Sequence, residues 1–174
     1  MTTVATAEAP PVTTDTGSQS FLLTRVQPGL SGLMDGSLST LAPIFAVVLA
    51  THHPLTAFYT GAATALGAGV SMAFSEGLSD TGDLTGRGSP VLRGAITGGG
   101  TFAGGIFHAL PFLIPGYGAA ISVAIAVVAT ELLILAYLRH KFFQTSFARS
   151  FVAVAIGGAI IASLSAGLGI LASG

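Results

Sequence analysis

The stretch LSGLMDGSLSTLAPIFAVVLA at residues 30–50 contains a single charged side chain, Asp35. A helix of this length can cross about 30 Å of hydrocarbon. A carboxylate in the centre of a membrane span costs on the order of 2.5–3.5 kcal/mol on insertion scales. A protein usually carries such a cost because the residue binds an ion or a proton. The stretch therefore predicts a membrane transporter, with Asp35 in the ion path, and not a soluble protein.

The composition of the whole chain supports a membrane environment. Only 7% of the residues are charged, 51% are hydrophobic, and the mean hydropathy is +0.81, whereas about 25% of the residues of a soluble domain are charged. The net charge of −1 gives no indication of nucleic-acid binding. The chain has no cysteine, which excludes disulfides and thiolate metal sites. A bound metal would need oxygen, imidazole or thioether ligands.

Five apolar segments of spanning length predict an all-α integral membrane protein with five transmembrane helices. They are Leu30–Thr51, Leu55–Ser79, Pro90–Ile114, Tyr117–Leu138 and Ala148–Ala172. Residues 25–174 are expected to form this membrane domain. Residues 1–24 are expected to be a disordered cytoplasmic tail, because residues 1–20 are rich in Thr, Ala and Pro and contain no Lys or Arg. A removed targeting sequence is the alternative for this segment.

The basic residues predict the orientation. With five spans, every Lys and Arg falls on one side of the membrane, in the N-terminal flank or in the connections after the second and fourth spans. These residues are Arg25, Arg87, Arg93, Arg139, Lys141 and Arg149. The positive-inside rule then places the N-terminus in the cytoplasm and the C-terminus outside.

Four side chains are predicted to share one depth and to bind a metal ion. From a rise of 1.5 Å per residue, Asp35 lies roughly 7 Å, Glu76 about 5 Å, Met72 about 10 Å and Glu131 roughly 12 Å from the inner surface. Met72 and Glu76 are one helical turn apart on the same face. Carboxylates together with a thioether favour softer divalent transition metals such as Fe²⁺. Carboxylates desolvated at this depth could also exchange a proton for the metal.

Each of these residues has a structural alternative. Asp35 could form an ion pair with Arg25 or cap a neighbouring helix, and Glu76 lies close enough to the interface to reach water. Met72 alone would more often pack in the core. Glu131 could form a hydrogen bond between helices.

Other polar and small residues favour structural interpretations. For His108, packing is favoured over a role as a proton or metal relay. Asp80 and Asp83 are expected to solvate the loop between the second and third spans, although they could also attract cations. Glycine pairs at GxxxG spacing predict close helix packing, within one bundle or across a dimer. These pairs are Gly32/Gly36, Gly94/Gly98 and Gly100/Gly104.

Two motifs resemble the vacuolar iron transporter family. They are Gly32-Leu33-Met34-Asp35-Gly36 at the start of the first span and Gly69-Val70-Ser71-Met72-Ala73-Phe74 in the second. The resemblance covers residues 25–172. It implies five spans, a cytoplasmic N-terminus, a homodimer, and export of Fe²⁺, often also Mn²⁺, from the cytoplasm by proton antiport. It also implies that Asp35 and Met72 line the translocation path.

The chain departs from this family pattern at two places. Thr64 stands where eukaryotic members carry a glutamate, eight residues before Met72, and Glu76 could take over its role. The connection Asp80–Ser89 is short and contains no glutamate, unlike the Glu-rich insertion of plant and yeast members. The stretches Ser75–Asp80 and Leu84–Pro90 are closer to the bacterial membrane-bound ferritin branch. That branch implies a bacterial inner-membrane location and a ferritin-like module. Here the module would be a separate partner protein, or transport would proceed without a soluble iron-collecting module.

The sequence thus predicts a transporter of divalent metal, with Fe²⁺ or Mn²⁺ as cargo and no permanently bound cofactor. The expected partners are the lipid bilayer, the metal ion, a second copy of the chain and a ferritin-like protein. The principal alternative is a non-transporting membrane anchor or assembly subunit for such a partner. A proton-linked carrier of small organic solutes is a further alternative. An enzyme is not expected, because no metal triad, nucleophile–base pair or cofactor motif stands out.

Overall fold

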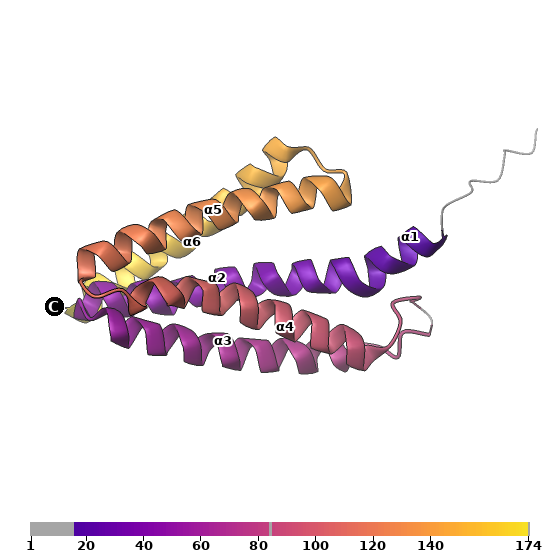
Figure 1. The fold of residues 1–174 in the computed structure, drawn as a ribbon, viewed down its shortest axis with the longest axis horizontal. Coiled ribbons are helices and arrows are strands. Elements are labelled where there is room, and N and C mark those ends of the chain that lie inside the picture. The colour runs from indigo at the N-terminus through magenta and orange to yellow at the C-terminus, as the bar shows by residue number, and fades with distance from the viewer. Residues whose placement is uncertain (1–15, 84, 174) are drawn as a thin grey trace, which may run out of the picture.

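The computed structural model describes residues 16–83 and 85–173, and all its regular elements are helical. In chain order the elements are α1 (Thr16–Phe21), the π-helical turn η1 (Leu22–Val26), α2 (Gln27–Thr51), α3 (Pro54–Gly77), α4 (Pro90–Ala109), the 3-10 turn η2 (Leu110–Leu113), α5 (Tyr117–Phe143) and α6 (Phe147–Ser173). Figure 1 shows α2, α3 and α4 side by side, with α5 and α6 forming a second layer.

The five predicted apolar segments are helical over most of their lengths, although the helices end before the predicted Ser79 and Ile114. Residues with special backbone preferences mark the helix ends. Pro54 and Pro90 begin α3 and α4, where the missing N–H of proline has no helical partner to lose. His52 ends α2 in the left-handed region with φ 56°. Gly116 precedes α5 with φ 96°, a conformation that glycine adopts without steric cost.

Four of these helices are long and apolar enough to cross a membrane. They are the continuous helical stretch Gln19–Thr51, together with α3, α5 and α6. α4 has 20 residues, but Arg93, His108 and its glycines make it more polar than the others. Among the described residues, four helices rather than five therefore meet this condition, and the count of five spans stays a prediction.

The structure differs from the predicted tail over residues 16–24. These residues are helical and lead directly into α2 through α1 and η1. The apolar run Phe21-Leu22-Leu23 can continue a helix that is already nucleated by α2, because each added residue gains a backbone hydrogen bond without a new nucleation cost. Residues 1–15 of the predicted tail lie outside the described part of the chain.

Successive long helices run in opposite directions, so the connections alternate between two ends of the bundle. The α3–α4 loop and the α5–α6 turn lie at the same end as α1, and the C-terminus lies at the other (Figure 1). All six Lys and Arg residues lie at the end of the bundle that contains α1, either in the connections or in the helix turns next to them. The structure therefore places the basic residues together, as the sequence pattern predicted.

Glycines hold α2 and α4 in backbone contact. A Cβ added to Gly36 would lie 1.9 Å from the carbonyl oxygen of Thr101, and one added to Gly104 would lie 2.4 Å from the carbonyl oxygen of Leu33. No side chain fits in such a space, so each helix provides glycine where the other approaches. The predicted packing role of these glycines within one bundle is confirmed at this contact.

The opposite face of α4 packs against α3 in the same way. A Cβ on Gly94 would lie 2.5 Å from the carbonyl oxygen of Ala73, and a Cβ on Gly98 would lie 2.5 Å from that of Gly69. α4 is therefore a glycine-rich helix enclosed between α2 and α3. This explains why α4 is the least apolar of the long helices: it has neighbours on two sides and needs less lipid-facing surface.

The bundle is apolar outside and partly polar inside. Large apolar side chains are exposed along α3 and α6, including Leu66 at 56% and Leu164 at 62%. Three threonines are buried, and the hydroxyl of each donates a hydrogen bond to a backbone carbonyl oxygen one turn earlier: Thr40, Thr97 and Thr101. An exterior of this kind is suited to hydrocarbon, and small residues with hydroxyls are typical of contacts between membrane helices.

The α2–α4 contact makes a direct prediction about stability. Gly36→Ala should force the two backbones apart and destabilise the fold by about 1–3 kcal/mol, the usual cost of overpacking. Gly99→Ala is the matched control on α4, because a Cβ at Gly99 has nothing within 4 Å. The measurement is unfolding of the purified protein in mixed micelles of increasing denaturing detergent, followed by circular dichroism. Equal unfolding midpoints for the two variants would contradict the close-packing interpretation.

Candidate functional site

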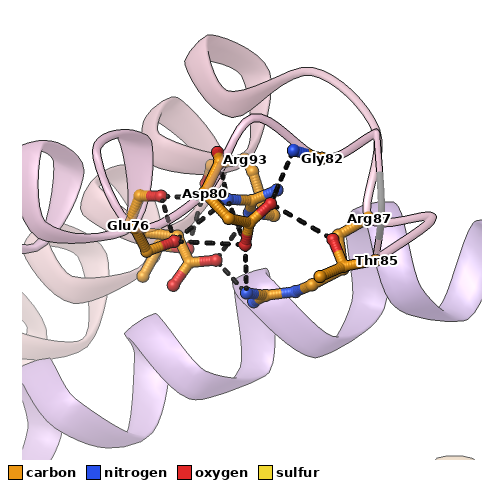
Figure 2. A network of polar contacts seen from close by, with 8 residues as sticks. Glu76, Asp80, Gly82, Thr85, Arg87 and Arg93 are labelled. Atoms are coloured by element: carbon orange, nitrogen blue, oxygen red, sulfur yellow. Dashed lines mark hydrogen bonds and ion pairs between the residues drawn. The ribbon is translucent and has the colours of Figure 1, made fainter.

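The first cluster of charges lies where α3 ends and α4 begins. Its centre is Arg93, whose side chain is fully buried. Arg93 Nε donates to Glu76 Oε1 at 2.6 Å, and Nη2 lies 3.3 Å from Asp80 Oδ2. Arg87 reaches the same two carboxylates from the loop, at 2.5 Å from Glu76 Oε1 and 3.3 Å from Asp80 Oδ2 (Figure 2).

This inner cluster is electrically balanced and also ends a helix. Two guanidinium groups face two carboxylates, which makes burial of the charges tolerable. Arg93 Nη2 also donates to the carbonyl oxygen of Glu76 at 3.1 Å and to Ser79 Oγ at 3.1 Å. A cation at a helix C-terminus pairs with carbonyls that lack helical partners. The geometry favours a structural role for Glu76, and its role as a metal ligand stays a prediction.

Asp80 organises the loop, which differs from its expected role as a solvating side chain. Its Oδ1 accepts hydrogen bonds from the Gly82 N–H at 2.6 Å and from Thr85 Oγ1 at 3.1 Å. Partial desolvation raises the pKa of Asp80, but these hydrogen bonds and the charges of Arg93 and Arg87 outweigh it, so the pKa lies below its ordinary value of 3.8. The carboxylate therefore holds the loop against α4.

The second cluster lies within the long helices and joins α2, α4 and α5. His108 on α4 is 3% exposed and the Glu131 side chain on α5 is 12% exposed; His108 Nε2 lies 2.8 Å from Glu131 Oε2. The other carboxylate oxygen, Oε1, contacts the hydroxyl of Ser37 on α2. Ser37 Oγ also lies 2.7 Å from the carbonyl oxygen of Leu33. We call His108, Glu131 and Ser37 the intramembrane trio.

The intramembrane trio borders a cleft. A cavity of about 570 Å³ lies between α4 and α5, and Glu131 forms part of its wall beside Gly104, Phe107 and Thr130. Apart from Glu131 and two hydroxyl residues, the wall is apolar or glycine. A small polar group at one side of an apolar cleft is the common form of a small-ligand site. The trio is therefore the part of the bundle where a buried ionisable group lies beside open space.

Asp35 and Met72 belong to neither cluster. Both are half-buried. The side chain of Asp35 forms no hydrogen bond or ion pair with any residue that the structure describes, including its predicted alternative partner Arg25. Ser37 is two residues further along α2, which places it about 200° around the helix from Asp35. Asp35 thus faces away from the side on which Ser37 meets Glu131.

The structure does not bring the four predicted metal ligands into one group. Among residues 16–83 and 85–173, no three His, Asp or Glu side chains are close enough to hold a metal ion together. Glu76 belongs to the inner cluster and Glu131 to the intramembrane trio. Glu131 has the inter-helix hydrogen bond that its alternative interpretation predicted. His108 is buried and packed, yet its ring also contacts a carboxylate, which packing alone did not predict.

Sequence reasoning missed Ser37 and the buried position of Arg93. The signal for Arg93 was present, because it lies in the first turn of a helix whose start faces the end of α3. Ser37 gave no signal, because a serine in a small-residue span is ordinary. Comparisons of the chain with protein-family models, with curated proteins and with solved structures gave no match.

Removing the buried guanidinium should destabilise the protein strongly. Arg93→Met leaves Glu76 and Asp80 with only Arg87 as a counter-charge, and breaking a buried ion pair on one side costs about 3–5 kcal/mol. Arg87→Met is the control, because its side chain is 26% exposed and a solvated ion pair contributes about 0–1 kcal/mol. Detergent unfolding should show the larger loss for Arg93→Met, and the reverse order would contradict the burial argument.

Acid should weaken the loop through Asp80. Because the folded-state pKa lies below 3.8, the unfolded chain binds the proton more readily. The stabilisation is complete above about pH 3.8 and is lost as pH falls through the folded-state pKa. Asp80→Asn should remove this part of the pH dependence of unfolding in detergent. Asp83→Asn, at an exposed loop position, should keep it; a wild-type curve for Asp80→Asn would show that Asp80 does not carry the effect.

Proposed function

We propose that the protein is a membrane transporter that moves a divalent transition-metal ion, Fe²⁺ or Mn²⁺, out of the cytoplasm. The observation that carries the proposal is Asp35, a carboxylate within an apolar helix that has no partner among the described residues. A structural carboxylate in such a place would be paired, as Glu76 is with Arg87 and Arg93. An unpaired one is available to a passing cation.

The resemblance of the Asp35 and Met72 motifs to the vacuolar iron transporter family supports the same function and specifies the metal class. The resemblance also supports α4 as a fifth span beside the four long apolar helices. The packing of α4 against α2 and α3 along its length supports the same proposal. The grouping of all basic residues at one end of the bundle supports a cytoplasmic N-terminus and an outer C-terminus. A bacterial inner membrane and a homodimer follow from the resemblance alone.

A proton gradient is the proposed energy source, used through antiport of protons against the metal ion. The sequence contains no GxxxxGK[ST] nucleotide-binding loop, and exchange of metal for protons requires only titratable side chains within the span. Asp35 and Glu131 are carboxylates at such positions. A metal ion that replaces a proton at a carboxylate couples the two movements without any large domain.

The rival function is a membrane anchor for a ferritin-like partner. One observation favours it: the glycine contacts and the inner cluster build a rigid three-helix unit from α2, α3 and α4. In that role the shape of the bundle matters and an unpaired carboxylate does not. The two functions therefore differ in their response to a neutral, isosteric change at Asp35.

Asp35→Asn should strongly reduce metal flux and leave the fold intact. We expect uptake of Fe²⁺ or Mn²⁺ into proteoliposomes to fall by about tenfold or more, equivalent to about 1.4 kcal/mol or more of lost ion binding. Asp83→Asn in the loop is the control and should keep wild-type flux. An imposed pH gradient should accelerate wild-type flux; indifference to the gradient would reject antiport. Unchanged flux in Asp35→Asn would remove Asp35 from the path, and absence of flux in the wild type would favour the anchor.

A further inference from the structure

His108 is held in one tautomer by the backbone of its own helix. Its Nδ1 lies 2.9 Å from the carbonyl oxygen of Gly104. A carbonyl oxygen only accepts, so Nδ1 carries the proton. The other ring nitrogen, Nε2, lies 2.8 Å from Glu131 Oε2.

Glu131 Oε2 is the partner atom of His108 Nε2. The atom is buried, and the polar atom beside it is His108 Nε2, at 2.8 Å. At this distance one proton shared between the imidazole and the carboxylate joins the two atoms, because two unprotonated acceptors would repel each other. A divalent cation that displaces this proton is bound by both atoms at once.

We propose that His108 and Glu131 form an intramembrane binding pair for a divalent transition-metal ion. The inference rests on the proposed function and deepens it, since it assigns the cargo a site in which His108, absent from the predicted ligand set, is a ligand. Imidazole together with a carboxylate is a ligand combination suited to Fe²⁺ and Mn²⁺, which prefer nitrogen and oxygen donors.

The spacing of the two atoms fits adjacent positions on such an ion. Two ligands at about 2.1 Å from a metal lie roughly 3.0 Å apart at a right angle and roughly 3.4 Å apart at a tetrahedral angle. The observed 2.8 Å is nearer the right-angled, octahedral value. Octahedral preference separates Mn²⁺ and Fe²⁺ from structural Zn²⁺, which is tetrahedral.

The surroundings provide the second shell that metal ligands generally have. Metal-binding histidines donate their other N–H to a carbonyl or carboxylate, as His108 does to Gly104. Ser37 contacts the remaining carboxylate oxygen and restrains the orientation of Glu131. Glu131 also lines the cleft between α4 and α5, which is large enough to hold water. No third His, Asp or Glu among the described residues joins His108 and Glu131, and a pair with two protein ligands releases its ion readily.

The test uses Mn²⁺ as the probe and the full chain in detergent. Electron paramagnetic resonance counts free Mn²⁺, and electron spin echo modulation detects an imidazole nitrogen bound to the metal. We expect one such nitrogen in the wild type. His108→Gln should remove the nitrogen signal, and both His108→Gln and Glu131→Gln should lower the affinity by about tenfold or more. Ser37→Ala should weaken binding while keeping the nitrogen signal.

His53→Gln is the matched control, because His53 is exposed in the α2–α3 connection, and it should bind Mn²⁺ as the wild type does. Absence of the nitrogen signal in the wild type overturns the inference even if a variant fails to fold, and so does full affinity in folded His108→Gln. Flux measured in parallel separates the two ideas. Transport with no nitrogen signal removes the site and keeps the transporter; binding at His108 without transport keeps the site and removes the transporter.

Discussion

The contact on which the rest of the bundle depends is the backbone approach of α2 to α4. Gly36 and Gly104 leave no room for a side chain against the carbonyl oxygens of Thr101 and Leu33. In lipid no hydrophobic effect drives two apolar helices together, so dispersion contacts along such glycine faces supply much of the attraction. The same approach brings Ser37 within reach of a carboxylate on a third helix. Packing and the candidate site therefore depend on the same glycines.

The two polar clusters solve the problem of buried charge in opposite ways. In the inner cluster every charge has an opposite charge beside it, and Arg93 also satisfies the carbonyl end of α3. The carboxylates of that cluster are already paired with guanidinium groups and are not available to bind a cation. In the intramembrane trio, one oxygen of Glu131 contacts the Ser37 hydroxyl and the other contacts His108 Nε2, with no Arg or Lys side chain paired to it among the described residues. A site that binds and releases a cation needs a carboxylate of the second kind, because a carboxylate that is already paired with guanidinium groups has little affinity for a further cation.

Much of the fold was predictable because its boundaries are local. Pro54, Pro90 and Gly116 end or begin helices through their own backbone preferences, and length and hydropathy identified the apolar segments. The glycine pairs also predicted close packing. The extent of α1 and η1 was not predictable, since the Thr-, Ala- and Pro-rich residues before Phe21 conceal a short apolar run. The polar residues of α4 can be seen in the sequence, but the reason for them, the enclosure of α4 between two helices, is shown only by the packing in the structure.

The candidate site was less predictable because residue counts fix neither the offset of one helix along another nor its rotation. Residue counts predicted similar depths for Glu76 and Glu131, but their partners Arg93 and His108 lie near opposite ends of α4, roughly 22 Å apart. The prediction of one common depth for these two carboxylates is therefore wrong. Asp35 lies about 200° from Ser37 on α2, which turns it away from Glu131. Only the packing of α5 beside α4 and α2 shows that the partner of Glu131 is His108.

The position of the His108–Glu131 pair also relates binding to the architecture. His108 belongs to the glycine-packed unit of α2, α3 and α4, and Glu131 belongs to α5, which meets α4 across a cleft instead of a close-packed face. A cation held between the two side chains is therefore a link between a tightly packed layer and a loosely packed one. The ion contributes most to cohesion where the helices themselves contribute least, so occupancy of the pair and the separation of α4 from α5 are thermodynamically linked. Such a link is what a carrier requires, because an ion that changes nothing in its surroundings on binding cannot bias the opening of a path.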